Sequence, residues 1–246
     1  MKIALASAPF QNGKTKENII NMQSFISAAK EQGAQCILFG ETALQGFDAF
    51  TWEIEKDREI AIELDGSVIQ YFCRMAKESG ICISFGYLEK EGSCLYSSQV
   101  VIGTDGKVLA NFRRVSAGWK VPSCTHPDYR EGEGFFVFDL LGKRTAIALC
   151  GDFWYDERVE EMKLLQPKLV LWPVYCDYAP DEWNKTVKYE YLEQTSKISA
   201  PVLLVNPYCN DAGDHEVSKG CCVHFEQGKI ITELPSGSPG IVVTEV

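Results

Sequence analysis

Short apolar runs that alternate with helical segments constrain the fold of this chain more than any other feature of its sequence. The runs have the length and composition of buried strands and cover residues 2–7, 36–41, 81–89, 144–150, 168–173 and 202–206. Strands that alternate with helices are typical of α/β folds in which part of the sheet is parallel.

Three segments between these runs have the spacing of helices. The first ends at Gly33, a residue type that commonly terminates helices, and its apolar face carries Ile19, Met22, Ile26 and Ala29. The second covers about residues 66–78 and leads through Gly80 into the strand at 81–89. The third is predicted over residues 181–199, and one apolar face carries Trp183, Val187, Tyr191 and Ile198.

Two predicted hairpins interrupt this alternation. One covers residues 97–112 with a turn at Asp105-Gly106, and the other covers residues 220–234 with a turn at Gln227-Gly228. Because hairpin strands are antiparallel, we expect the sheets to be mixed. The sequence contains no repeat, low-complexity segment or linker, which predicts a single domain over residues 1–246.

Charge and hydropathy argue against two classes of partner. The chain has 34 acidic and 24 basic residues, a formal net charge of -10, and no basic stripe that could neutralise phosphates. Neither nucleic acid nor a membrane is therefore an expected partner. No apolar run approaches the ~18 residues of a membrane span, and the apolar stretch near the first residues is shorter than the roughly 7–15 residues of a signal-peptide core. We therefore expect a soluble, cytoplasmic protein.

The chain has ten cysteines but no C-x-x-C pair. This density is below the roughly 8–10% that is typical of disulfide scaffolds. Most of the thiols, such as Cys36 and Cys222 in strand-like surroundings, are expected to be small, reduced core residues. His126, His215 and His224 have no partner at metal-ligand spacing, so no metal site is predicted.

Reactive side chains stand where three of the predicted strands end. Glu41 ends the first of these strands, Arg113 and Arg114 end the first hairpin, and Cys150 ends the run at 144–150. A thiol that attacks a carbonyl carbon needs a base for its proton and a cation for the developing oxyanion, and these positions supply both. Each residue also has a simpler interpretation, as a loop carboxylate, a solvated arginine or a buried thiol.

The segments around these residues resemble the carbon-nitrogen hydrolase family, also called the nitrilase superfamily. "FGETALQGF" resembles the motif of the catalytic Glu, and "IALCGDFW" resembles the motif of the catalytic Cys. Between them, "DGKVLANFRR" is similar to the segment that leads to the catalytic Lys, and "YREGEGFFVFDLLGKR" is similar to the Gly, strand and turn before the Cys. "VLLVNPY" and "GCCVHFEQGKII" resemble the closing strands, so the resemblance covers nearly the whole chain.

This resemblance implies a fold and a chemistry. The fold would be an α/β, four-layer α-β-β-α sandwich with two mixed sheets, and members commonly pair, which implies a homodimer or larger homo-oligomer. Cys150 would attack an amide or nitrile carbon and form a thioester, with Glu41 as general base. No metal or organic cofactor takes part in this chemistry.

Arg114 stands at the position of the family's catalytic Lys. Ser116 and Ala117 replace the His and Leu that usually follow. An arginine keeps its charge and can stabilise an oxyanion, but it cannot donate a proton and its charge lies farther from the backbone. Two functions therefore stay open, an amidase whose site has adjusted to Arg114 and a non-catalytic ligand-binding member that has lost the catalytic Lys. Lys120 is an alternative cation.

A third hypothesis pairs Cys150 with a histidine base, but no histidine stands at a predicted strand end. The leading hypothesis is a thiol-dependent hydrolase that cleaves the C–N bond of a small linear, non-peptide amide. By the resemblance, the segment after the Cys is closer to the branch that acts on glutamine-type amides. The predicted substrate-binding residues are aromatic, with core packing as the alternative for each: Trp119, Phe153, Trp154 and Tyr175.

Overall fold

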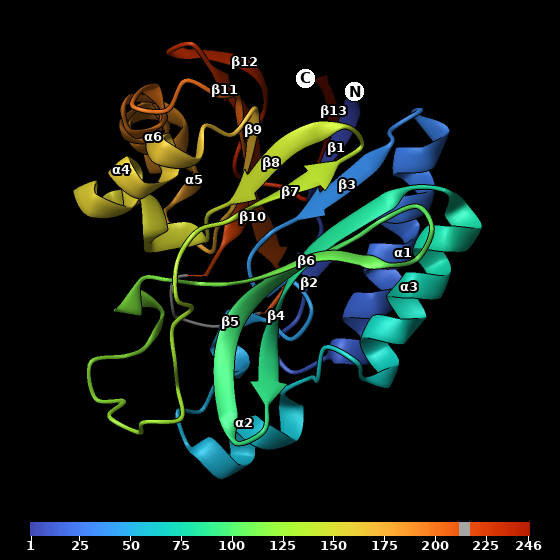
Figure 1. Cartoon of the computed structure of the whole chain (residues 1–246), viewed down its shortest axis with the longest axis vertical. Coiled ribbons are helices and arrows are strands. Elements are labelled where there is room, and N and C mark those ends of the chain that lie inside the picture. Colours follow the sequence, from blue (N-terminus) through green and yellow to red (C-terminus); the bar gives the residue numbers. More distant parts are fainter. Residues whose placement is uncertain (212–216) are drawn as a thin grey trace.

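Two β-sheets packed face to face form the centre of the computed structural model, which describes residues 1–211 and 217–246 (Figure 1). The strands of the first sheet, in spatial order, are β13 (Gly240–Glu245), β1 (Lys2–Ser7), β3 (Cys36–Phe39), β4 (Cys82–Glu91), β5 (Cys94–Ile102) and β6 (Val108–Arg113). Those of the second are β12 (Lys229–Leu234), β11 (Lys219–Glu226), β10 (Val202–Cys209), β9 (Leu169–Pro173), β8 (Lys143–Ile147) and β7 (Val137–Leu140). The short β2 (Pro9–Phe10) pairs with β10. Both sheets are mixed, since β1 is parallel to β3 but antiparallel to β13, and β10 is parallel to β9 but antiparallel to β11.

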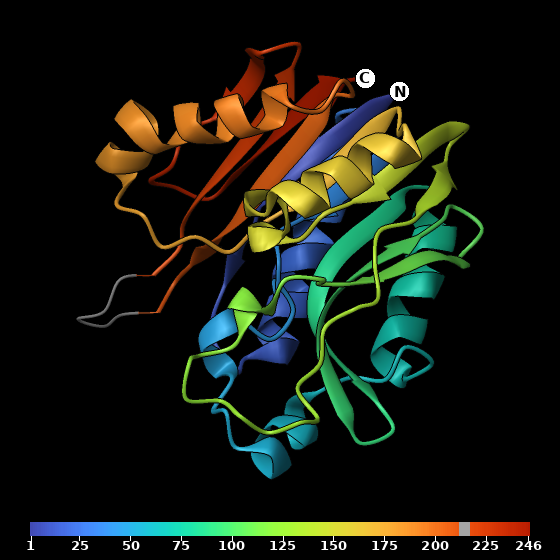
Figure 2. The same cartoon turned by 60° about the vertical axis from the view of Figure 1, so that its left-hand side comes forward.

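Helices cover the outer face of each sheet (Figures 1 and 2). The first sheet carries α1 (Thr15–Glu31) and α3 (Ser67–Ser79), and the second carries α4 (Asp156–Leu165), α5 (Pro180–Glu182), a π-helical turn (Trp183–Val187) and α6 (Lys188–Ser196). The short α2 (Ile54–Ile60) lies at one end of the molecule. This arrangement confirms the predicted four-layer α-β-β-α sandwich. Among the helices of the described residues, none has the length and apolar character to cross a lipid bilayer.

Strand β1 shows why these runs are apolar along their whole length. Ile3 and Leu5 pack in the core between the two sheets, whereas Ala4 and Ala6 pack in a second core under the helices. A strand that is buried on both faces has no polar side to alternate with. Each fully buried large apolar side chain stabilises the fold by about 1.5–3 kcal/mol relative to an exposed one. The strands of the first sheet are therefore stabilised from both faces.

The structure corrects the ends of several predicted elements. The strand predicted over residues 36–41 ends at Phe39, so Glu41 lies two residues beyond it. The strand predicted over residues 144–150 ends at Ile147, and Cys150 instead begins a 3-10 turn. The helix predicted over residues 181–199 starts with α5, continues through the π-helical turn and ends at Ser196. Pro201 follows shortly after, and a proline cannot continue a helix. The helices α2 and α4 and the strands β2 and β13 were not predicted at all.

Candidate active site

Glu41, Arg114 and Cys150 come together although they follow three different strands. Glu41 lies just after β3, Arg114 directly after β6, and Cys150 shortly after β8 of the second sheet. Their side chains meet where the ends of the two sheets face each other. The meeting place is thus formed by both sheets rather than by one loop.

A buried ion pair joins Glu41 to Arg114. Arg114 Nη1 donates to Glu41 Oε1 at 3.1 Å, and Ser97 Oγ donates to the same oxygen at 2.9 Å. Arg114 Nε donates to Ser116 Oγ at 2.9 Å. The second carboxylate oxygen of Glu41, Oε2, is buried and has no hydrogen-bond partner among the described residues. A buried acceptor without a partner is costly, which makes this oxygen available to a substrate or a reacting proton.

Two glycines let the backbone of Glu41 pack closely against its neighbours. A Cβ atom on Gly86 of β4 would lie 2.4 Å from Thr42 N and 2.7 Å from Glu41 Cα. A Cβ atom on Gly40 would lie 2.4 Å from Pro207 Cδ of β10. The position of the Glu41 carboxylate is therefore determined by backbone packing against both sheets.

Asp152 connects the turn of Cys150 to the segment that carries Arg114. Its buried carboxylate accepts hydrogen bonds from the backbone N–H groups of Leu149 at 2.9 Å, Ser116 at 2.8 Å and Val115 at 3.2 Å. Burial raises the pKa of Asp152 to about 6, although these hydrogen bonds and Arg114 act in the opposite direction. Asp152 was not among the predicted site residues, and its position two residues after Cys150 is the signal that could have identified it.

Cys150 occupies a strained turn. Its φ of 41° lies in the left-handed region, where a residue other than glycine costs of order 1–3 kcal/mol. The Trp172 indole donates to the Cys150 carbonyl at 2.9 Å, and the Cys150 thiol lies 3.5 Å from the carbonyl oxygen of Tyr175. The surrounding contacts therefore hold a half-buried sulfur at a bend between the two sheets.

A second thiol, that of Cys176, changes the pKa of Cys150. A hydrogen bond from Cys176 is the largest cause that lowers the pKa of Cys150, and the charge of Arg114 also lowers it, while burial and Glu41 oppose them. The same contact and burial raise the pKa of Cys176, whose sulfur also lies 3.0 Å from the Tyr191 hydroxyl. Of the two thiols, Cys150 is therefore the one that loses its proton more easily. Sequence analysis did not identify Cys176, because the two cysteines lie on different loops.

Arg114 keeps its charge in this setting. Burial alone lowers the pKa of its guanidinium, but the negative charges of Glu41, Cys150 and Asp152 outweigh burial and raise that pKa. The site thus combines a permanent cation, a buried carboxylate with one free oxygen, and a thiol that ionises readily. These are the groups that nucleophilic attack on a carbonyl carbon requires.

Comparison with known proteins identifies the family of this chain. The sequence profile of the carbon-nitrogen hydrolase family matches residues 2–246. The chain belongs to the carbon-nitrogen hydrolase family. Among curated relatives of this family member, a citrullinase from Francisella tularensis is 22% identical over 231 residues, which cover 87% of this chain and 76% of the relative.

Solved structures show the same fold. A cysteine mutant of an amidase of the nitrilase superfamily from Nesterenkonia AN1 is 19% identical with a TM-score of 0.79, over 100% of this chain and 90% of the amidase. In another structure of that amidase, acrylamide has added to the active-site cysteine. A glutamine-dependent NAD+ synthetase from Acinetobacter baumannii is 22% identical with a TM-score of 0.80, and this family member covers 44% of its length.

The predicted substrate-binding residues lie in different surroundings. Tyr175 is half-buried beside the Cys150 thiol, and its hydroxyl donates to Asp48 at 2.7 Å. Trp154 is 44% exposed. Trp119 and Phe153 are each 1% exposed, and Phe153 packs against Trp172 and Phe135. Of these four residues, Tyr175 is the one whose backbone carbonyl contacts the Cys150 sulfur.

A continuous series of aromatic rings leads away from Tyr175. Consecutive members have ring centroids 5.0 to 6.1 Å apart, in the order Tyr175, Phe47, Phe50, Trp52, Trp119 and Tyr129. The indole N–H of Trp119 is buried and has no hydrogen-bond partner among the described residues. The series joins the loops that follow β3, β6 and β9.

The alternative cation, Lys120, is engaged elsewhere. Its Nζ lies 2.5 Å from Glu131 Oε1 and donates to the Tyr129 carbonyl at 3.2 Å. Arg114, not Lys120, is therefore the cation that contacts Glu41.

Both histidines within the described residues form hydrogen bonds with groups other than Cys150. His126 accepts a hydrogen bond from its own loop, and His224 is buried and bonds to Thr244 Oγ1 at 2.7 Å. His215 lies outside the described residues. Within residues 1–211 and 217–246, no group of three or more His, Cys, Asp or Glu side chains is placed to hold a metal ion.

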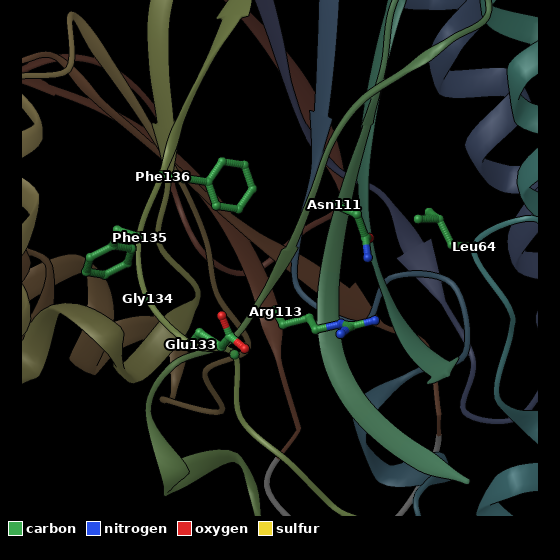
Figure 3. Close-up of a pocket in the computed structure, with 8 residues that line it drawn as sticks. Leu64, Asn111, Arg113, Glu133, Gly134, Phe135 and Phe136 are labelled. Carbon is green, nitrogen blue, oxygen red and sulfur yellow. The ribbon is translucent and has the colours of Figure 1, made fainter. Parts of the chain in front are cut away.

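Arg113 and Arg114 are neighbours in the chain but pair with different carboxylates. Arg113 points away from Glu41 and pairs with Glu89 at 2.6 Å and Glu91 at 2.8 Å. It lines a cavity of about 620 Å³ together with Asn111 and Phe136 (Figure 3). Because Glu89 and Glu91 already neutralise Arg113, this cavity offers no free cation to an anionic ligand.

Proposed function

We propose that this chain is a thiol-dependent hydrolase of a small linear amide, in which Cys150 is the nucleophile, Glu41 the general base and Arg114 the oxyanion partner. One observation carries the proposal: the Glu41 carboxylate binds Arg114 through Oε1 and keeps Oε2 free. The lowered pKa of Cys150, caused mainly by Cys176 and Arg114, supports the role of the thiol. Family membership supports C–N bond hydrolysis as the reaction class.

In the first half of the proposed reaction, Glu41 accepts the thiol proton and the sulfur of Cys150 attacks the amide carbon. The carbonyl electron pair moves onto oxygen, and the Arg114 guanidinium stabilises the resulting negative charge. Glu41 then gives its proton to the amide nitrogen, the C–N bond breaks, and ammonia or an amine leaves. The acyl group stays on Cys150 as a thioester.

In the second half, a water molecule gives a proton to Glu41 and its oxygen attacks the thioester carbon. The C–S bond breaks, the carboxylic acid leaves, and the thiol recovers the proton. Arg114 cannot donate a proton, so every proton transfer in this scheme passes through Glu41. A general base of this kind typically contributes about 10²- to 10⁴-fold in rate.

A non-catalytic, ligand-binding role is the second candidate. The observation that favours it is Arg114 itself, since the family resemblance places a lysine at this position and the bulkier guanidinium occupies the site. A protein of this kind would bind amides without turning them over.

One experiment separates the two candidates. Ammonia release from a panel of small linear amides is measured for the parent and for Cys150→Ala, Glu41→Gln and Arg114→Lys at equal folded concentration. If the chain is a hydrolase, we expect the parent to be active and Cys150→Ala to be inactive, and the rate of Glu41→Gln to be lower by about 10²- to 10⁴-fold. We also expect lower activity in Arg114→Lys, because a shift of about 1 Å in a catalytic group costs on the order of 10²-fold.

A silent parent together with activity in Arg114→Lys would instead support the binding protein. An active parent whose rate is unchanged in Arg114→Ala would show that the guanidinium has no part in the reaction.

A further inference from the structure

The backbone conformation of Gly151, the residue after Cys150, does not explain why this position holds a glycine. Glycine is favoured where φ lies in the left-handed region, but Gly151 is not among the residues with positive φ. A Cβ atom placed on it would lie 2.6 Å from Arg114 Nη2 and 3.3 Å from Ser116 Oγ. Contacts of 2.6 Å do not occur for real Cβ atoms, so the requirement at this position is for space.

The guanidinium has little freedom to retreat from such an atom. Arg114 Nε is bonded to Ser116 Oγ at 2.9 Å and Nη1 to Glu41 Oε1 at 3.1 Å. The residue is only 4% exposed, and close packing leaves a buried side chain few alternative positions. A methyl group at position 151 would therefore displace the fork that pairs with Glu41.

We propose that Gly151 is a positioning residue that makes the space in which an arginine, rather than a shorter cation, can serve beside Cys150. The inference rests on the proposed function for its effect on turnover, but the geometry of the pair does not depend on it. Arg114 and Gly151 form a matched pair, in which the larger side chain at one position requires the absence of a side chain at the other. A lysine at position 114 has no atom that corresponds to Nη2, so it would tolerate alanine at position 151.

A double-mutant cycle tests this pairing. It compares the parent, Gly151→Ala, Arg114→Lys and the double variant by two measurements. The first is the pH midpoint of Cys150 alkylation by iodoacetamide, followed by peptide mapping. The second is kcat and KM for ammonia release from an amide.

The alkylation midpoint reports the charged and titratable groups around the thiol. These are Cys176, Arg114 and Glu41, together with Tyr191 and Tyr178, whose own pKa values respond to the charge of Cys150. Arg114 is the group that Gly151→Ala would displace. We expect Gly151→Ala to raise the midpoint and to lower kcat by about 10²-fold in the arginine background, as for a displacement of about 1 Å. In the lysine background, the same substitution is expected to change neither quantity by more than about twofold, the usual error of such a cycle.

Gly118→Ala is the matched control. A Cβ atom on Gly118 would lie 3.6 Å from the same Arg114 Nη2, an ordinary van der Waals distance, so this variant should behave like the parent. Equal effects of Gly151→Ala in both backgrounds, or no effect in either, would overturn the pairing.

Two further outcomes are also decisive. If the parent turns over no amide, the proposed function fails, and the alkylation midpoints still decide whether the pair exists. If Gly151→Ala does not fold, recovery of folding in the double variant supports the pair, and failure of both variants contradicts it.

Discussion

At the scale of single residues, Cys150 differs from the thiols buried in the strands in the direction in which its pKa is shifted. Burial raises the pKa of Cys36, Cys221 and Cys222, whereas Cys176 and Arg114 lower that of Cys150. Since the thiolate is the reactive form, we expect iodoacetamide to label Cys150 first, with a pH midpoint below the ~8.5 of a free cysteine. Peptide mapping under native conditions measures both. Labelling of Cys150 no faster than Cys36 would contradict the nucleophile assignment.

The contribution of Cys176 can be separated by Cys176→Ala. A hydrogen bond has a net worth of about 1 kcal/mol, which corresponds to about 0.7 of a pKa unit, so the Cys150 midpoint should rise by that amount. Cys124→Ala, at a half-buried cysteine that does not act on Cys150, is the control and should leave the midpoint unchanged. An unchanged midpoint in Cys176→Ala would leave Arg114 as the source of the lowered pKa.

Part of this site could be predicted from the sequence. Glu41, Arg114 and Cys150 each follow an apolar run, and strand ends are recognisable because hydrophobicity stops there. Cys176 and Gly151 could not be identified in this way. Cys176 acts through a contact between two loops, and the need for glycine at position 151 arises from the size of a side chain on the other sheet.

At the scale of elements, one buried carboxylate shapes the loop between β3 and α3. Asp57 of α2 is fully buried and accepts hydrogen bonds from Thr51 N and Oγ1, each at 2.8 Å, from Trp52 N at 3.0 Å and from the Tyr129 hydroxyl at 2.7 Å. Trp52 has a φ of 61°, a conformation that costs a non-glycine residue roughly 1–2 kcal/mol. Asp57 therefore holds a strained residue of the aromatic series in place and joins it to Tyr129.

We expect Asp57→Asn to loosen this loop, because an amide group cannot accept all four hydrogen bonds. An unsatisfied buried partner costs about 1–3 kcal/mol, and for a chain of this size a loss of about 2 kcal/mol lowers the Tm by roughly 4–8 °C. Thermal unfolding followed by tryptophan fluorescence measures the change. Asp65→Asn, at an exposed position, serves as the control. Equal Tm values for the two variants would mean that the loop does not depend on Asp57.

At the scale of the whole molecule, the layers could be predicted but the final strand could not. Alternating strands and helices with two hairpins predicted mixed sheets covered by helices. Strand β13 follows β12 of the second sheet but joins the first, where it pairs with β1. Its side chains are mostly half-buried, and its partner stands at the opposite end of the sequence, so no local pattern indicates the pairing. Helix α4 was missed for a different reason, because its helical face is only weakly apolar.

The β1–β13 pairing has a mechanical consequence. Lys2 lies opposite Glu245 and Ser7 opposite Gly240, and Val246 N donates to the Met1 carbonyl at 3.0 Å, so residues 1 and 246 lie side by side (Figure 1). A pulling force applied between these two residues loads the hydrogen bonds one after another and unzips the seam. A force applied between residue 246 and Gln11, beyond the far end of β1, loads them together in shear. Optical-tweezer measurements should therefore find a much lower rupture force in the first geometry, because a force between residues 1 and 246 breaks the hydrogen bonds of the pair singly.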